Sequence, residues 1–184
     1  AFDRVDRRRR HLSGHGATRR MKPILVIGCG NPLRSDDGVG RYAARQIAAT
    51  VPQDDVAVLV RHQLTPDLAE PVRKARLVIF IDASCEDPPG KIHSRRLAPE
   101  AALPGLLMHH LTPAGLLACT KSIYGNCPPA VLYSVGARCF EFGEVLSDEV
   151  YRSLPELLTR IRRRIIRQTA HSNTPDRIET SSAF

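Results

Sequence analysis

The amino-acid sequence predicts an α/β protein: a three-layer α/β/α sandwich with a mostly parallel, twisted sheet of about five strands. Short apolar runs typical of strands alternate along the chain with segments of helical periodicity. Residues 77–81 (LVIFI) are continuously apolar and rich in branched side chains, as in a central parallel strand that is covered on both faces. A long final segment carries one apolar stripe, which suits a helix that packs on one face of such a sheet.

The expected elements follow one another in the order βαβαββαβα. The predicted strands comprise residues 24–27, 56–61, 77–81, 91–97 and 130–135. The predicted helices comprise residues 38–49, residues 65–74, a segment that starts at 112–113, and a final helix that starts after Ser147.

Each element has a local signal. The first three strands are short apolar runs, and the apolar residues of the first helix recur at helical spacing. Two Thr-Pro pairs, at 65–66 and 112–113, predict helix starts, because threonine caps helices and proline suits the first helical position. Residues 91–97 alternate as in an edge strand, and AVLYSV at 130–135 is a further strand. Ser147 is the predicted cap of the final helix, whose apolar stripe comprises Val150, Leu154, Leu157, Leu158, Ile161 and Ile165.

The charge is distributed unevenly along the chain. The sequence has 184 residues and a net charge of +8. Residues 1–22 contain eight Lys or Arg and two Asp, so most of the excess positive charge lies there. We expect residues 1–21 to be a disordered extension or a cloning remnant upstream of a natural start at Met21, residues 22–167 to form a single α/β domain, and residues 168–184 to be a polar tail.

Composition also limits the partners and the compartment. No apolar run approaches the roughly 18 residues of a membrane-spanning helix, and no apolar stretch follows the arginines of the N-terminal arm. The arm lacks the interleaved aromatic residues of a nucleic-acid-binding segment. The five cysteines are widely spaced without a CxxC pair, which excludes a zinc-finger pattern and favours reduced thiols. We therefore expect a cytoplasmic monomer that binds neither nucleic acid nor membrane.

Residues 25–40, LVIGCGNPLRSDDGVG, contain the first candidate site residues. A strand ends at a Gly-Cys-Gly sequence, Asn-Pro turns the chain, and Asp36 and Asp37 arrive where a helix begins. In α/β proteins a loop of this kind forms the mouth of a site. Because its carboxylates would repel a phosphate, the loop suits a cation or acid–base chemistry.

Further candidates follow other strands. Asp82 comes directly after the third strand, and the pair His109-His110 precedes a helix. Two carboxylates and one imidazole at the carboxyl ends of parallel strands would make a three-ligand cation site, which suits nickel or zinc. Acid–base hydrolysis without a metal is the alternative chemistry. The pattern H-x-L-T-P occurs at 62–66 as well as at 109–113, so His62 is a second, weaker histidine candidate.

Each candidate also has a purely structural explanation, and the residues alone leave both explanations open. Asp36 and Asp37 can interact with the dipole of the helix that follows. Asp82 can accept hydrogen bonds from loop amides, and at least one histidine of the adjacent pair can pack or face water. Cys29, between two glycines, is expected to be a buried core residue rather than a ligand.

Four stretches in this order resemble the hydrogenase maturation proteases, over about residues 22–166. They are ILVIGCGNPLRSDDGVG, VIFIDAS, HHLTPAGLL and AVLYSVGARCFEFGEVLS. In that family the positions that match Asp37, Asp82 and His109 bind nickel. His109 matches better than His110, because the family ligand lies two residues before the leucine that Leu111 matches. Asp36 belongs to the motif but is not carried over as a ligand.

The resemblance implies an activity as well as a fold. Hydrogenase maturation proteases remove a C-terminal extension from the precursor of the nickel–iron hydrogenase large subunit once nickel has been inserted. For this chain the resemblance implies a metal-dependent endopeptidase with Asp37, Asp82 and His109 as catalytic and metal-binding residues. Nickel would be carried by the substrate or shared with it. The sequence shows no serine in a nucleophile elbow and no cysteine clearly paired with a base.

Two other functions are weighed against this one. A peptidyl-tRNA hydrolase also begins with a strand and a G-x-G-N-P turn, but it requires a following tyrosine and a T-R-H-N-x-G segment, whereas LRSDD follows the turn here. A nucleotide-binding module would need glycine in place of Leu33, and the loop carboxylates would repel a pyrophosphate.

Overall fold

Five strands form one sheet in the computed structural model, which describes residues 23–52, 54–100 and 111–172. The strands are β1 (Ile24–Gly28), β2 (Val56–Val60), β3 (Leu77–Ser84), β4 (Ile92–Leu97) and β5 (Ala130–Gly136). Their order across the sheet is β2-β1-β3-β5-β4. All neighbours are parallel except β4, which runs antiparallel to β5 at one edge. The predicted α/β fold with a mostly parallel sheet is confirmed.

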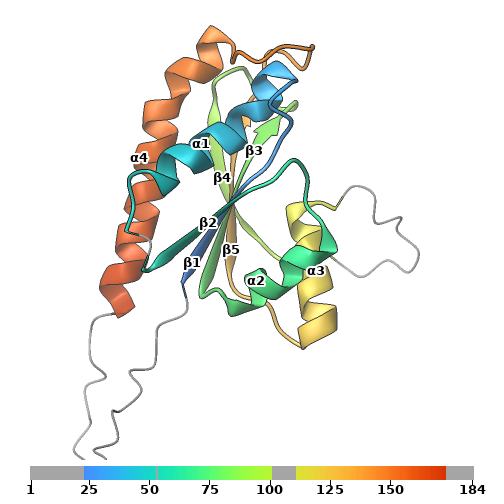
Figure 1. Cartoon of the computed structure of the whole chain (residues 1–184), viewed down its shortest axis with the longest axis vertical. Coiled ribbons are helices and arrows are strands. Elements are labelled where there is room, and N and C mark those ends of the chain that lie inside the picture. The colour runs from blue at the N-terminus through green and yellow to red at the C-terminus, as the bar shows by residue number, and fades with distance from the viewer. Residues whose placement is uncertain (1–22, 53, 101–110, 173–184) are drawn as a thin grey trace, which may run out of the picture.

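The helices cover both faces of this sheet (Figure 1). They are η1 (Ser35–Gly38), α1 (Val39–Ala48), η2 (Pro66–Leu68), α2 (Ala69–Lys74), α3 (Pro113–Tyr124) and α4 (Asp148–Ser172), where η marks a 3-10 helix. Helices α1 and α4 pack on one face, and α2 and α3 pack on the other. Each face of the sheet has its own apolar core. Along β1, Ile24 and Val26 belong to the core under α1 and α4, and Leu25 and Ile27 belong to the core under α2 and α3, because successive strand residues point to opposite faces.

Glycines allow α1 to lie close to the strand ends. A Cβ atom at Gly40 would collide with the carbonyl oxygens of Cys29 and Ile81, and one at Gly28 would collide with the backbone of Gly40. Gly30 has a φ of 126°, which favours glycine, and its α-carbon lies against the carbonyl of Asp37. The glycines of the first motif therefore bring η1 and the start of α1 to the carboxyl ends of β1 and β3.

Several element boundaries differ from the sequence prediction. Strand β3 continues through Asp82 to Ser84, because its last three residues pair with Ser134, Val135 and Gly136 of β5. Helix α4 continues to Ser172, beyond residue 167, where the sequence places the start of a polar tail. The stripe predicted for this helix is buried, except that Leu158 is half-buried.

The two Thr-Pro helix starts differ from each other. Thr112 caps α3 as predicted, since its hydroxyl oxygen accepts a 2.9 Å hydrogen bond from the backbone of Gly115. Thr65 occupies the N-cap position of η2 and Pro66 begins that helix, as predicted, but the side chain of Thr65 makes no capping hydrogen bond. Within the described ranges no helix is both long and apolar enough to cross a bilayer.

Candidate functional site

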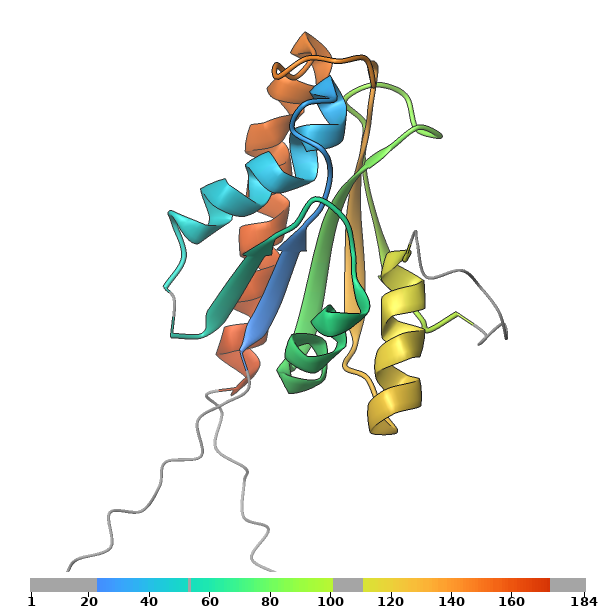
Figure 2. The same ribbon diagram turned by 45° about the vertical axis from the view of Figure 1, so that its right-hand side comes forward.

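The carboxyl ends of the three neighbouring strands β2, β1 and β3 bring together Arg61, Cys29 and Asp82. Cys29 directly follows β1 and donates a 3.0 Å backbone hydrogen bond to Ile81 of β3. Arg61 directly follows β2 and donates a 2.9 Å backbone bond to Gly28 at the end of β1. Because Asp82 is the next residue after Ile81, it lies beside Cys29 at the same edge of the sheet. In Figure 2, η1 and the start of α1 lie beyond this edge.

Asp37 reaches the same edge from η1. Its Oδ2 accepts a 2.8 Å hydrogen bond from the backbone of Asn31, which folds the Asn-Pro turn back over the helix start. The side chain is half-buried. Its negative charge raises the pKa of both Asp82 and Cys29, so these three side chains share one electrostatic environment. The structure thus places Asp37 and Asp82 near each other, although they are far apart in the sequence.

Asp82 is the side chain of this group that titrates near neutrality. Burial raises the pKa of its carboxyl from 3.8 to about 6, the hydrogen bond from Ala83 opposes this rise, and the charge of Asp37 adds to it. That bond, at 3.0 Å, goes to Oδ1. A partly buried carboxyl beside a second carboxylate is stabilised by a proton or by a cation. The site therefore suits either proton transfer at Asp82 or the binding of a positive ion.

Asp36 has a different role from Asp37. It is fully buried, and its carboxylate accepts four hydrogen bonds of 2.7 to 3.0 Å: two from Ser147, through its backbone and its hydroxyl, and one each from the backbones of Arg138 and Cys139. Burial raises the pKa of Asp36, but these hydrogen bonds outweigh it and hold the pKa below 3.8. Asp36 therefore fixes the β5–α4 loop and the start of α4 against η1.

Cys29 is buried, as the sequence predicts. Burial raises the pKa of its thiol to about 12; the charges of Asp82 and Asp37 add to the rise and Arg61 opposes it. A thiol of this kind stays protonated at neutral pH, which disfavours it as a nucleophile. All five cysteines lie in the described ranges, and all five are free.

His109 and His110 lie outside the described residues. The structure does show how their flanks are joined: the hydroxyl of Thr112 donates a 2.9 Å hydrogen bond to Glu100, and Glu100 donates a 3.3 Å backbone bond to Ala114. His62, the weaker histidine candidate, is exposed at the loop after β2. Among the described residues no group of three His, Cys, Asp or Glu side chains is arranged to hold a metal ion.

Sequence reasoning missed Arg61. It was expected only as the last residue of a strand, yet its charge acts on Cys29 beside the two carboxylates. The available signal was its position, because a cation at the carboxyl end of a parallel strand faces the usual site of such a fold. At the Cys29 thiol, Arg61 opposes the effect of both carboxylates on the pKa.

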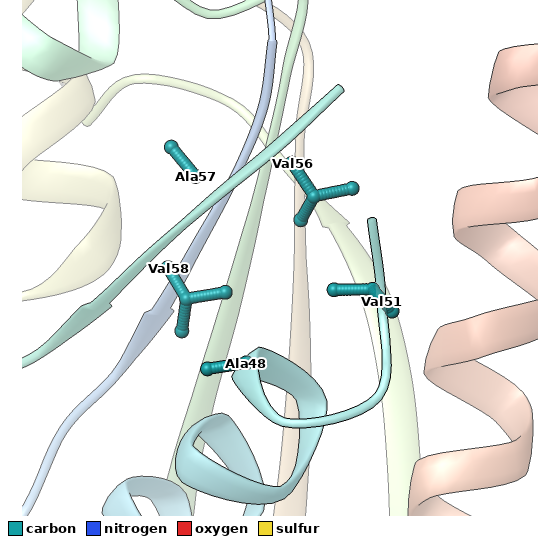
Figure 3. A pocket seen from close by; sticks show the side chains of 5 residues that line it. All are labelled: Ala48, Val51, Val56, Ala57 and Val58. Carbon is teal, nitrogen blue, oxygen red and sulfur yellow. The ribbon is translucent and has the colours of Figure 1, made fainter. Parts of the chain in front are cut away.

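A crevice of about 270 Å³, lined by apolar side chains, lies beside the first residues of strand β2 (Figure 3). It is lined by Ala48, Val51, Val56, Ala57 and Val58. Val56 pairs with Ile24 at the start of β1, so the crevice is far from the carboxyl ends of the strands. Without a polar or titratable side chain in its lining, it offers no chemistry.

Comparison with solved structures identifies the fold. The hydrogenase maturating endopeptidase HybD from Escherichia coli superposes with a TM-score of 0.63 at 20% identity, over 79% of this chain and 93% of that one. The [NiFe] hydrogenase maturation protease HycI from Thermococcus kodakarensis superposes with a TM-score of 0.60 at 21% identity, over 79% and 93%. The chain has the fold of the hydrogenase maturation proteases.

Other comparisons set the limits of this likeness. The hydrogenase 2 maturation peptidase from a Thaumarchaeota archaeon has a TM-score of 0.58 at 24% identity, over 78% of this chain and 98% of that one. No protein-family model matches the sequence, and no curated protein matches it significantly. At these identities the likeness concerns the fold, while activity has to be argued from the site.

Proposed function

We propose that this chain is an endopeptidase that removes the C-terminal extension of the precursor of a nickel–iron hydrogenase large subunit after nickel insertion. The fold supports this proposal, since several solved structures that it resembles are hydrogenase maturation endopeptidases. The observation that carries it is the approach of Asp37 and Asp82 at the carboxyl ends of β1 and β3, where the fold forms its site.

The residues present fit a nickel ion carried by the substrate. Asp37 and Asp82 place two carboxylates in one partly buried environment, and their mutual repulsion favours a cation between them. His109 would supply the imidazole ligand that the resemblance implies, and mixed oxygen and nitrogen ligands suit nickel. The metal centre would supply positive charge at the site and would act as the condition for cleavage.

The chain's own residues would orient the carboxylate of Asp37 and exchange a proton at Asp82. Asp36 holds η1 rigidly against the β5–α4 loop, so Asp37 is presented in one orientation. Because Oδ1 of Asp82 accepts a hydrogen bond, Oδ2 is the atom that can take up a proton, and with a pKa of about 6 the carboxyl is mostly ionised at neutral pH and can accept a proton there.

Exposed apolar side chains beside the site suit a protein substrate. Phe142 is 85% exposed and Val145 78% on the β5–α4 loop, and Leu33 is 43% exposed on the loop before η1. A backbone hydrogen bond of 2.9 Å from Gly143 to Leu33 joins the two loops. Apolar groups held in water by a fixed backbone are typical of surfaces that bind a macromolecular partner.

Cleavage of a nickel-loaded precursor by carboxamide variants tests the site. We expect Asp37→Asn and Asp82→Asn to leave the tail attached, as read from the intact mass of the precursor, whereas the exposed Asp67→Asn serves as a matched control that cleaves normally. Calorimetry with nickel would show binding to the control and weaker binding to both site variants. Cleavage at an unchanged rate by both site variants would overturn the assignment of Asp37 and Asp82.

A further inference from the structure

A groove lined by arginines lies between helix α4 and the edge strand β4, apart from the site described above. Its volume is about 210 Å³, and its lining comprises Ser94, Tyr133, Arg160, Arg163, Arg164 and Arg167. Ser94 pairs with Tyr133 across β4 and β5, and Tyr133 belongs to the core under α1 and α4. The groove therefore opens on the α4 face of the sheet, at its edge.

The four arginines occupy one side of α4, because their spacing of three, four and seven residues matches the helical repeat. Residues 157–172 contain five arginines and no acidic residue. Arg160 pairs with Glu156 and donates a 3.2 Å hydrogen bond to the carbonyl of Ile92 on β4, which ties the helix to the strand. The groove is therefore positive, chiefly through Arg163 and Arg164, because Glu156 offsets the charge of Arg160, and it has a fixed wall.

Helix polarity alone does not account for this cluster. A cation gains from the helix dipole only within about the last turn, and α4 ends at Ser172. Arg160, Arg163 and Arg164 lie two or more turns earlier. Arg96 adds a further positive charge from β4, because it is two residues after Ser94 and so lies on the same face of the strand.

We propose that this groove binds an acidic segment of a protein partner in an extended conformation. Guanidinium groups pair with carboxylates through two parallel hydrogen bonds, so a row of arginines complements a row of Asp or Glu. Strand β4 is the last strand in the sheet, and an extended segment can add to such an edge through its backbone. Alternate side chains of that segment would then face the arginines of α4.

The groove suits a peptide better than a nucleic acid. Single-stranded nucleic acids are held by aromatic side chains on which the bases stack, as well as by positive charge. Tyr133, the aromatic residue of the groove, is only 4% exposed and forms part of its floor. The groove thus offers charge and a strand edge without a stacking surface. This proposal does not depend on the protease activity.

Fluorescence anisotropy on the full chain tests the proposed binding with three labelled probes. The first is a peptide of about ten residues in which Glu alternates with Thr, the second is the same peptide with Gln in place of Glu, and the third is an oligouridine of similar length. We expect the Glu peptide to bind at least about tenfold more tightly than the Gln peptide at low salt, and less tightly as salt rises. The variant Arg163→Ala/Arg164→Ala should weaken binding of the Glu peptide about tenfold.

The matched control is Arg45→Ala/Arg152→Ala, which removes the same charge from outside the groove. It should change the affinity by less than about twofold, and because both variants keep the basic N-terminal arm, binding to the arm cancels in the comparison. The single change Arg163→Glu, at an exposed position, provides a second groove variant. Equal losses in the groove and control variants would overturn the proposal. Tighter binding of oligouridine, lost in the groove variants alone, would assign the groove to nucleic acid and overturn it as well.

Discussion

Replacing Asp82 by asparagine is expected to stabilise the protein increasingly as pH rises. The pKa of Asp82 is about 6 in the folded chain against 3.8 for an ordinary aspartate, mainly because the carboxyl is buried. Below 3.8 the carboxyl is neutral in both the folded and the unfolded chain. Between the two values the folded chain binds more protons than the unfolded one, so the free energy of unfolding of the wild type falls as pH rises towards 6. Asparagine cannot ionise and avoids this loss.

The size of the effect follows from the pKa difference. The full difference corresponds to about 3 kcal/mol, of which about 2 kcal/mol develops between about pH 4.5 and about pH 7.5. Urea unfolding of wild type and Asp82→Asn at both pH values measures it, and the exposed Asp67→Asn is the control. Packing effects of the new amide are independent of pH and cancel in the comparison. A stability difference that stays constant with pH, or shrinks as pH rises, would refute the buried, charge-coupled environment of Asp82.

Three further predictions concern the same edge of the sheet. Asp36→Asn should lower the free energy of unfolding by on the order of 3 kcal/mol in chemical unfolding, because it weakens four hydrogen bonds to a buried carboxylate. Since the pKa of Asp36 is held below 3.8, its contribution to stability is present above that value and is lost as pH falls through the lowered pKa. A decrease in the free energy of unfolding under about 1 kcal/mol at neutral pH would contradict this role. Nickel affinity measured by calorimetry should fall as pH drops below about 6, because protons compete with nickel for Asp82. A nickel affinity that does not change between about pH 7.5 and about pH 5.5 would exclude Asp82 as a ligand. Phe142→Ala should leave the melting temperature unchanged and raise the KM for the precursor several-fold, because the ring is 85% exposed, and an unchanged KM would mean that the ring does not contact the substrate.

The sequence predicted the sheet well because the relevant signals are local. The apolar run of β3 and the glycines before η1 describe strand burial and close helix packing directly, and both features are present. Strand ends were less accurate. Nothing in the sequence around Asp82 shows that it pairs with Ser134, so its place inside β3 depends on a partner strand far along the chain.

The site was only partly predictable for the same reason. Asp36 and Asp37 are adjacent and chemically identical, and they differ because Asp36 meets Arg138, a residue 102 positions away. The residues alone suggest only that both aspartates can interact with the dipole of the helix that follows, and the resemblance sets Asp36 aside as a ligand. Arg61 joins the site through the order of the strands, which local patterns do not encode. The choice of His109 over His110 comes from the family resemblance and stays a prediction.

The most direct test of the proposed function is the intact mass of a nickel–iron large-subunit precursor after incubation with this protein. Two samples of the precursor, one loaded with nickel and one free of it, would be treated side by side and measured over time. The account predicts that only the nickel-loaded precursor loses its C-terminal extension, in a single cut. Equal cleavage of both samples would contradict nickel recognition, and no cleavage of either would contradict the protease activity itself.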